Sequence, residues 1–286
     1  MTVSPKQKID WRKLRDLSAL LKKNDLNTVC VSARCPNKSE CFGKKTATFL
    51  ILGDTCTRHC RFCSVKKDGS LQPPDIEEAQ RIAGFARSLD LDHIVVTSVT
   101  RDDLADGGAG HFARTIAAIK TDNASAIMEV LTPDFQGDMA ALDMVMGSAP
   151  EIFNHNIETV PRLYAEIRPQ AGYRRSLDVL AYVKAHYPAA VTKSGLMLGL
   201  GETRAEIVSV LRDLREAACD VIVLGQYFQP AKENVPVSRY LPEEEFSELV
   251  EIARGLGFLS VAAGPYMRSS YMARELYQKI KNQFRS

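Results

Sequence analysis

The sequence lacks any long apolar run: no uncharged apolar stretch in its 286 residues approaches the roughly 18 residues that a membrane-spanning helix requires. It also lacks an excess of charge of one sign, because 37 Lys and Arg residues are balanced by 35 Asp and Glu residues. This balance gives no support for a dedicated nucleic-acid-binding protein. Residues 1–23 are polar and basic without an apolar core segment, so we expect no secretory signal there.

Cysteine, in contrast, is abundant and crowded. Of the seven cysteines, all but Cys219 lie between residues 30 and 63. An odd total, a long chain and no expected secretory signal argue against a disulfide framework. Cysteines can also be small buried hydrophobic residues, but their crowding in one short window favours metal binding. We therefore expect a cytoplasmic protein that binds metal through the residues Cys30, Cys35, Cys41, Cys56, Cys60 and Cys63.

From residue 48 onward, short apolar runs alternate with amphipathic segments, which predicts an α/β fold. The predicted strands lie at 48–52, 93–99, 126–131, 151–157, 192–198, 220–227 and 258–262. The predicted helices lie at 11–22, 75–89, 108–120, 137–146, 176–186, from 203, 242–257 and 269–282. Because the interior strands are continuous apolar runs, we expect a parallel sheet covered by helices on both faces. About six β/α units predict a partial (β/α) barrel.

Two of the helices have clear start signals. Thr203 with Glu206 three residues later fits a capping box. Pro242, followed by three glutamates, reads as the first turn of a helix that Gly257 ends. The chain has no internal repeat and no low-complexity linker, so we expect one barrel with an extension at each end. The expected division is 1–47 for the cysteine-bearing N-terminal extension, 48–263 for the barrel and 264–286 for the C-terminal segment.

Cys56, Cys60 and Cys63 have the spacing C-x3-C-x2-C and follow the first predicted strand. Active sites of parallel α/β folds lie at the carboxyl ends of the strands. Three thiolates on one loop can bind three irons of a [4Fe–4S] cluster and leave the fourth iron open to a substrate or cofactor. Zinc is the alternative, but zinc sites usually pair C-x2-C or C/H spacings, and here His59 lies between the cysteines with no second pair.

This spacing resembles the signature of the radical SAM superfamily. The resemblance implies that S-adenosylmethionine binds the open iron, and that one electron from the cluster cleaves it to methionine and a 5′-deoxyadenosyl radical. It places Phe62 beside the adenine. It also implies that the S-adenosylmethionine site is lined by Gly107 and Gly108, by Gly195, Met197 and Gly199 of a G-x-[IM]-x-G-x-x-E pattern, and by Asn154, Asn156 and Glu158 at a strand end. For residues 106–108, a plain turn before a helix is the alternative.

Cys30, Cys35 and Cys41 form a second trio with the spacing C-x4-C-x5-C, and this trio resembles the lipoyl synthase family. In that family the trio binds an auxiliary [4Fe–4S] cluster. The resemblance covers roughly residues 30–275. The matching segments are 33–37 (ARCPN), 46–49 (TATF), 52–58 (LGDTCTR), 98–104 (SVTRDDL), 153–159 (FNHNIET), 168–171 (RPQA) and 264–271 (GPYMRSSY).

The resemblance also implies that a serine of the Arg-Ser-Ser-Tyr motif is the fourth ligand of the auxiliary cluster. We assign Ser270, with Ser269 as the alternative; one of the two could instead cap the last helix. Serine oxygen is a harder and poorer iron ligand than thiolate, which suits a cluster that must be opened. Cys219 we expect to be a buried core residue, and His155 to be packed or hydrogen-bonded instead of acting as an acid or base.

The activity implied is insertion of two sulfur atoms, at carbons 6 and 8, into an octanoyl chain on a lysine, with the auxiliary cluster as sulfur source. The implied partners are an octanoylated lipoyl carrier domain or H-protein and a ferredoxin- or flavodoxin-type electron donor. We expect a monomer with no nucleic-acid or membrane partner. The basic segments 6–23 and 279–285 could contact an acidic partner, although a solvated terminus is the simpler interpretation.

Two rival functions remain. A biotin-synthase-like enzyme is disfavoured by the C-x4-C-x5-C trio and the Arg-Ser-Ser-Tyr motif. An electron-carrying iron–sulfur protein would need each cluster to be fully ligated by the protein, whereas C-x3-C-x2-C offers only three thiolates.

Overall fold

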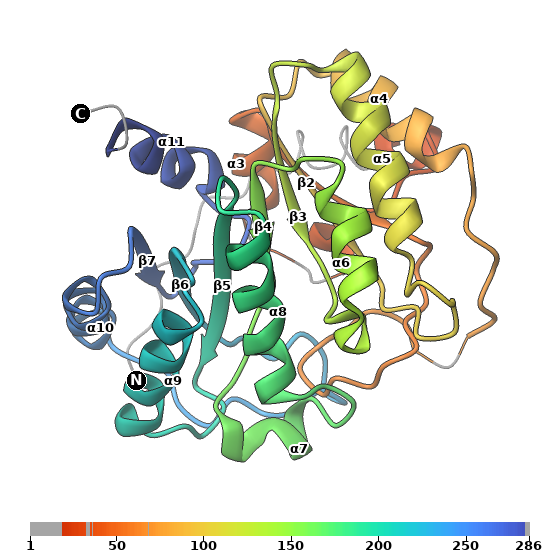
Figure 1. The fold of residues 1–286 in the computed structure, drawn as a ribbon. Helices are drawn as coiled ribbons and strands as arrows, with labels where there is room; N and C mark the ends of the chain where they lie inside the picture. The colour runs from red at the N-terminus through yellow and green to blue at the C-terminus, as the bar shows by residue number, and fades with distance from the viewer. Residues whose placement is uncertain (1–18, 33–34, 36, 68, 284–286) are drawn as a thin grey trace. The chain divides into compact units, whose positions relative to one another are not determined.

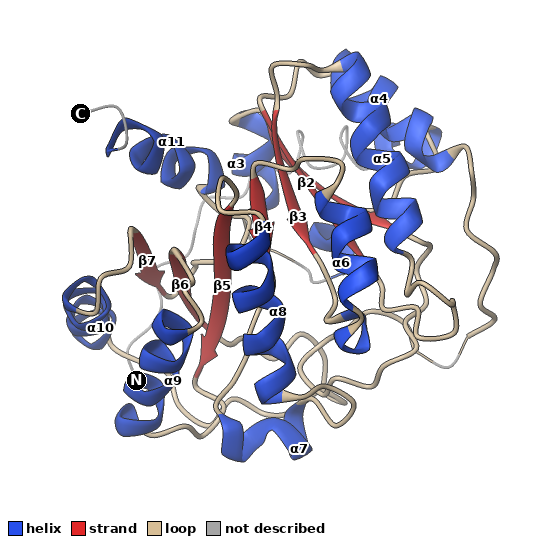
Figure 2. Cartoon of the chain, viewed as in Figure 1, coloured by secondary structure: helices blue, strands red, loops and turns tan. Residues whose placement is uncertain are grey.

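The computed structural model describes residues 19–32, 35, 37–67 and 69–283 (Figure 1). Two compact units divide the chain. The first contains the described residues up to Arg58 together with 64–151, and the second contains 59–63 together with 152–283. The predicted helix at 11–22 falls largely outside the described residues, of which 19–23 are helical. Each unit is built of parallel strands that alternate with helices, shown in red and blue in Figure 2.

In the first unit, three parallel strands lie in chain order. They are β1 (Thr46–Ile51), β2 (His93–Ser98) and β3 (Ile127–Leu131), and Val96 pairs with Phe49 on one side and with Val130 on the other. The helices are α2 (Val29–Ser32) and α3 (Lys38–Gly43) before β1, α4 (Glu78–Ser88), α5 (Ala109–Asp122), the 3-10 turn η1 (Phe135–Gly137) and α6 (Met139–Met146). All six residues of β1 are buried, as a strand covered on both faces requires.

In the second unit, four parallel strands also lie in chain order. They are β4 (Ile152–Asn154), β5 (Val191–Leu198), β6 (Val221–Gln226) and β7 (Ser260–Gly264). The helices are η2 (Pro161–Leu163), α7 (Tyr164–Ile167), α8 (Tyr173–His186), α9 (Arg204–Glu216), α10 (Glu243–Gly255) and α11 (Ala273–Gln283). Figure 1 shows α8 and α9 beside the strands, and α8 packs on β5 while α10 packs on β7.

The predicted α/β class is confirmed, and each predicted strand overlaps an observed one. The capping box is present, because the Thr203 hydroxyl accepts from the backbone N–H of Glu206 and the Glu206 carboxylate accepts from that of Thr203. Pro242 is not in the first helical position: it has extended backbone (φ −70°, ψ 160°) and is the N-cap of α10. The last helix begins at Ala273 and not at residue 269, because Met272 has a positive φ of 55° that interrupts helical geometry.

The C-terminal segment is anchored on the second unit by apolar packing and by close backbone approach. Leu276 of α11 forms a buried cluster with Val223 and Ala262, and Met267 packs against this cluster. Gly225 lies against the backbone carbonyl of Met267, where a β-carbon would collide with the oxygen. The segment that carries the Arg-Ser-Ser-Tyr motif therefore lies on the carboxyl-terminal part of β6.

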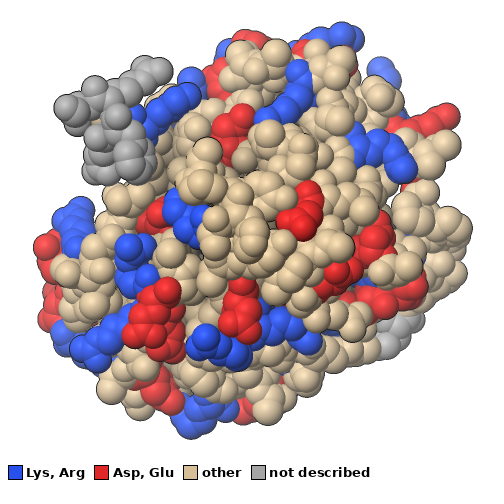
Figure 3. All heavy atoms as spheres, viewed as in Figure 1, with Lys and Arg blue, Asp and Glu red and all other residues tan. Residues whose placement is uncertain are grey.

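No helix within the described ranges is long and apolar enough to cross a bilayer. The face of the molecule seen in Figure 3 carries basic and acidic side chains interspersed with each other, without a patch of one sign. This mixing agrees with the near-neutral net charge of +2.

Candidate functional site

The loop that carries Cys56 leaves β1 through a strained turn. Leu52 has a positive φ of 68°, and its backbone N–H donates to the Glu78 carboxylate at 3.0 Å. His111 contacts the same carboxylate oxygen at 2.7 Å. The base of the loop is closed where the backbone N–H of Cys56 donates to the carbonyl of Lys66 at 2.9 Å. Buried polar groups on α4 and α5 therefore fix the direction in which the chain enters the cysteine loop.

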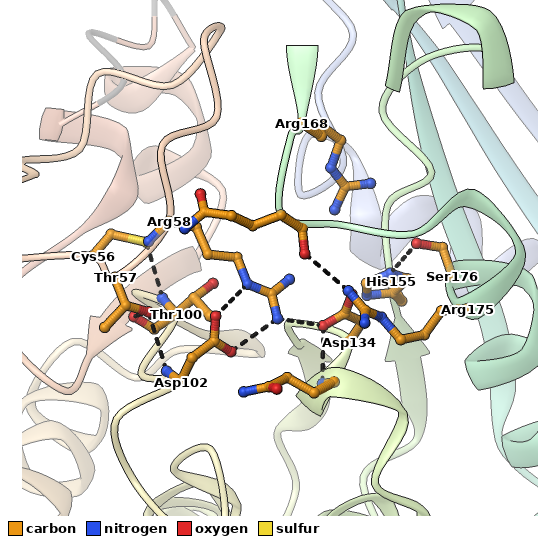
Figure 4. Close-up of polar contacts among 12 residues, drawn as sticks. Cys56, Thr57, Arg58, Thr100, Asp102, Asp134, His155, Arg168, Arg175 and Ser176 are labelled. Atoms are coloured by element: carbon orange, nitrogen blue, oxygen red, sulfur yellow. Dashed lines mark hydrogen bonds and ion pairs between the residues drawn. The ribbon is translucent and has the colours of Figure 1, made fainter. Parts of the chain in front are cut away.

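The sulfur of Cys56 accepts two backbone hydrogen bonds. The N–H of Arg58 lies 3.4 Å from Sγ, and the N–H of Thr100, on the loop after β2, lies 3.3 Å from it (Figure 4). Hydrogen bonds to a ligand sulfur help to set the reduction potential of an iron–sulfur cluster. The two backbone donors therefore lie where they would act on a cluster bound through Cys56.

Arg58 is buried between two carboxylates. Its guanidinium donates from Nε and Nη2 to Asp102 at 2.6 and 2.9 Å, and from Nη2 to Asp134 at 2.6 Å (Figure 4). The Arg58 side chain is 4% exposed and that of Asp134 is 0% exposed. Although burial opposes its charge, the hydrogen bonds that Arg58 donates to these two carboxylates raise its pKa above the ordinary value. The three residues form a charged cluster beside Cys56.

The other half of the loop is held by the second unit. The N–H of Arg61 donates to the carbonyl of Ile167 at 2.8 Å. The Asn234 side-chain amide donates to the carbonyls of Arg61 and Cys63, both at 3.0 Å. Burial, with a contribution from nearby Cys63, raises the pKa of Tyr227 to about 12. Backbone contacts therefore fix the chain around Cys60 and Cys63, which are half-buried like Phe62.

None of the three cysteines of this loop forms a disulfide. No three His, Cys, Asp or Glu side chains among the described residues are arranged to hold a single metal ion. A [4Fe–4S] cluster makes a different demand, since each thiolate binds a different iron. Half-buried cysteines outside disulfides, one of them hydrogen-bonded at its sulfur, fit such a cluster in their chemistry.

The second trio lies on α2, α3 and the segment between them. Cys30 is tied to β1 through Thr28, whose hydroxyl donates to the carbonyl of Thr48 at 2.6 Å and accepts from the N–H of Cys30 at 3.3 Å. A hydrogen bond with Cys35 raises the pKa of Cys30 well above its ordinary value, and burial and the charges of Cys35 and Cys41 add to the effect. The side chains of Cys30 and Cys35 are therefore in hydrogen-bond contact, which is compatible with their being ligands of one cluster.

The glycines of the 106–108 segment have a structural explanation within the protein. Asp106 accepts from the backbone N–H groups of Gly108 and Gly110 at 2.9 and 2.8 Å, which caps the start of α5. Gly108 is the N-cap with a φ of 91°, and a β-carbon there would collide with Leu52. At Gly107 it would lie 2.9 Å from the ring of Phe135. The turn before a helix is thus present, and the contact with S-adenosylmethionine stays a prediction.

The G-x-[IM]-x-G-x-x-E segment is held by hydrogen bonds to its own last residue, Glu202. Glu202 accepts from the backbone N–H groups of Gly199 and Leu200 at 2.6 and 2.9 Å. Gly199 has a φ of 98° and lies against the Arg239 carbonyl, so a side chain is excluded there. Glu202 was not among the predicted site residues, although its place at the end of the motif was the available signal. Met197 lies half-buried on β5, where its N–H donates to the carbonyl of Glu158.

Asn156 connects the strand end after β4 to the C-terminal segment. Its amide nitrogen donates to the Glu158 carboxylate at 3.0 Å, and its amide oxygen accepts from the Ser269 hydroxyl at 2.8 Å. A β-carbon at Gly195 would lie 2.7 Å from the Asn156 oxygen and 2.8 Å from the Ser269 oxygen, so only glycine fits. Burial raises the pKa of Glu158. Three predicted residues are therefore brought together with Ser269, and Asn154 is buried at the end of β4.

Two expectations about neighbouring residues are confirmed. Cys219 is fully buried, and burial raises the pKa of its thiol to about 12, so it is a core residue. His155 is buried, and its Nε2 lies 3.1 Å from the Ser176 hydroxyl, so it is packed and hydrogen-bonded (Figure 4).

Known proteins resemble this chain closely in sequence. The sequence model of the Radical SAM superfamily matches residues 50–214. A lipoyl synthase from Caldanaerobacter subterraneus subsp. tengcongensis is 51% identical over 274 residues, covering 93% of this chain and 96% of the relative. A lipoyl synthase from Chlorobaculum parvum is 50% identical over 292 residues, covering 99% of this chain and 100% of the relative.

Solved structures resemble the chain in fold. The crystal structure of methylornithine synthase matches with a TM-score of 0.57 and 12% identity, covering 94% of this chain and 92% of that one. That of HydG, a maturase of the [FeFe]-hydrogenase, matches with a TM-score of 0.60 and 15% identity, covering 92% and 60%. At such low identity, these matches support the fold alone.

Proposed function

Because this chain belongs to the lipoyl synthase family of the radical SAM superfamily, we propose that it inserts two sulfur atoms, at carbons 6 and 8, into an octanoyl chain carried on a protein lysine. One S-adenosylmethionine is consumed for each C–H bond that is broken. An auxiliary [4Fe–4S] cluster is the source of sulfur. The rival biotin-synthase-like and electron-carrier functions have no specific observation in their favour.

The two cysteine trios have separate roles in this proposal. Cys56, Cys60 and Cys63 hold the cluster that cleaves S-adenosylmethionine. Cys30, Cys35 and Cys41 hold the auxiliary cluster. The observation that carries the proposal is the 50–51% identity to lipoyl synthases over nearly the whole chain, and the hydrogen bond between the side chains of Cys30 and Cys35 supports a second cluster site. When bound, the first cluster supplies one-electron chemistry that the protein side chains cannot supply.

Ser270 is the proposed fourth ligand of the auxiliary cluster. Its neighbour Ser269 donates its hydroxyl to Asn156 and so has a structural task already. This division of tasks supports Ser270 over Ser269. Because Gly225 and Gly195 give the segment close backbone support, Ser270 is carried by an anchored stretch of chain.

The chain's own residues organise the S-adenosylmethionine site. Its proposed lining consists of an aromatic residue, two glycine segments and a strand end: Phe62; Gly107 and Gly108; Gly195, Met197 and Gly199; and Asn154, Asn156 and Glu158. Glu202 and Asp106 fix the backbone of the two glycine segments by accepting paired N–H donors. Preorganised backbone of this kind lets a ligand bind without a reordering cost.

The proposed partners are an octanoylated lipoyl carrier domain or H-protein and a ferredoxin- or flavodoxin-type electron donor. We propose a monomer located in the cytoplasm, where cysteines persist without disulfides, as all seven in this chain are found. The proposed division into an extension (1–47), a barrel (48–263) and a C-terminal segment (264–286) assigns the auxiliary-cluster ligands to the two end segments and the ligands of the other cluster to the barrel.

Anaerobic iron and sulfide analysis tests the two-cluster proposal. We expect about eight irons per chain, as two four-iron clusters require, and about four irons after alanine replaces the cysteines of either trio. The protein is then incubated with an octanoylated lysine peptide, S-adenosylmethionine and a reductant. A mass increase from added sulfur supports the substrate, and 5′-deoxyadenosine without a thiolated peptide contradicts it.

A further inference from the structure

The ion pairs of Arg58 with Asp102 and Asp134 place charged side chains in a largely buried position where apolar side chains could pack. The guanidinium bonds with both Asp102 and Asp134, so one positive charge lies between two carboxylates. Replacing buried ion pairs by apolar side chains is often neutral or stabilising, so such a cluster is a poor device for stability alone. Its position, two residues after Cys56, suggests a function in the cysteine loop.

A continuous path of hydrogen bonds links the group formed by Arg58, Asp102 and Asp134 to the sulfur of Cys56. The Asp102 carboxylate accepts hydrogen bonds from Nε and Nη2 of Arg58. The backbone N–H of Asp102 donates to the Thr57 hydroxyl at 3.1 Å. Thr57 in turn bonds to the Thr100 carbonyl through its N–H and its hydroxyl, both at 3.0 Å. Thr100 and Arg58 are the two residues whose N–H groups reach Cys56 Sγ. The two loops that supply these donors are thus joined by the Arg58–Asp102 pair (Figure 4).

We propose that Arg58 is a positioning residue for Cys56: its bonds to Asp102 and Asp134 hold the two N–H···S contacts in place and thereby set the reduction potential of the cluster bound there. The inference rests on the proposed cluster at Cys56, Cys60 and Cys63. Donors to a cysteine sulfur stabilise the reduced cluster, which carries more negative charge, so they raise its potential. Loosening them shifts the potential to a more negative value, so an electron donor reduces the cluster less readily.

Arg58→Lys is the decisive variant. Lysine keeps the positive charge, but as a point charge it lacks the planar fork that bonds two carboxylates at once. We expect a more negative midpoint potential in a redox titration of the full chain, followed by the electron paramagnetic resonance signal that responds to S-adenosylmethionine. Arg58→Met adds the loss of charge, and we expect a larger shift in the same direction. A wild-type potential in Arg58→Lys would overturn the proposal, because charge and not geometry would then suffice.

A second measurement does not need the cluster. In cluster-free protein, we expect amide hydrogen exchange at Arg58 and Thr100 to become faster in Arg58→Lys, because their N–H groups are no longer held on Cys56. Arg61→Lys is the matched control: it keeps the charge as Arg58→Lys does, it lies on the same loop, and the ion pair of Arg61 with Glu166 is exposed at the surface. We expect it to change neither the exchange rates nor the potential. Unchanged exchange in Arg58→Lys would also overturn the proposal.

The two measurements separate this inference from the proposed function. Wild-type protein that binds no cluster at Cys56, Cys60 and Cys63 contradicts the proposed function, and the exchange experiment still decides whether Arg58 positions the donors. A bound cluster with a potential insensitive to Arg58 contradicts only the positioning role. Should Arg58→Met fail to fold, Arg58→Lys and the exchange rates decide the question.

Discussion

The two cysteine trios are supported in very different ways. Around Cys56, a fully buried and a partly buried carboxylate hold Arg58, and two backbone donors reach the sulfur. Around Cys30, the described links to β1 run through Thr28 and through the backbone of Asn27, and the Cys30 side chain bonds with Cys35. A cluster that turns over electrons repeatedly needs a fixed environment, because its potential depends on hydrogen bonds to sulfur. A cluster that gives up its sulfur needs ligands that can release it.

Replacing one cysteine of each trio should give the largest difference between the two trios. We expect Cys56→Ala to abolish 5′-deoxyadenosine formation entirely. We expect Cys35→Ala to retain it and to abolish only the thiolated peptide, because the first cluster remains. Chromatographic measurement of both products under anaerobic conditions distinguishes them. Loss of 5′-deoxyadenosine in both variants would show that the trios do not act separately.

The two adjacent serines offer a finer test. We expect Ser270→Ala to lose the thiolated product with 5′-deoxyadenosine formation retained. We expect Ser269→Ala to weaken S-adenosylmethionine binding, because its hydroxyl bonds to Asn156. Equilibrium binding and product analysis on both variants decide the assignment. The reverse pattern would transfer the ligand role to Ser269.

The support around Cys56 should also appear in stability. We expect Arg58→Met in cluster-free protein to lower the free energy of unfolding by about 3–5 kcal/mol, because the fully buried Asp134 and the partly buried Asp102 lose their bonds to the guanidinium. Arg61→Met should cost less than about 1 kcal/mol, because its ion pair is half exposed. Urea denaturation followed by circular dichroism compares them. Equal urea midpoints for the two variants would show that Arg58 and Arg61 contribute equally to stability, which contradicts this prediction.

The C-terminal segment gives the smallest expected effect. We expect Gly225→Ala to cost about 1–3 kcal/mol, because a methyl group would overpack against the Met267 carbonyl. It should reduce iron at the auxiliary site while the other cluster is retained. Gly255→Ala, whose added carbon meets nothing within 4 Å, should be neutral or slightly stabilising. Thermal unfolding and iron analysis of both variants test this, and equal effects would contradict the anchoring role.

Local signals in the sequence predicted the elements well. Continuous apolar runs gave parallel strands, and the Thr203 and Glu206 spacing gave the start of α9. Boundaries were predicted less well where the backbone leaves regular geometry. Met272 has a positive φ and delays α11, and Pro242 precedes α10 as its N-cap. Such positions depend on contacts distant in sequence.

The sequence by itself determined the family, the α/β class and the two trios of cysteines, because spacing along the chain is a local property. Only the tertiary structure decided how each trio is held. The bonds of Arg58 with Asp102 and Asp134 cross separations of 44 and 76 residues, and Ser269 meets Asn156 across 113. No local pattern encodes such contacts, because they form only when parallel strands bring their carboxyl-terminal loops to the same edge of a sheet.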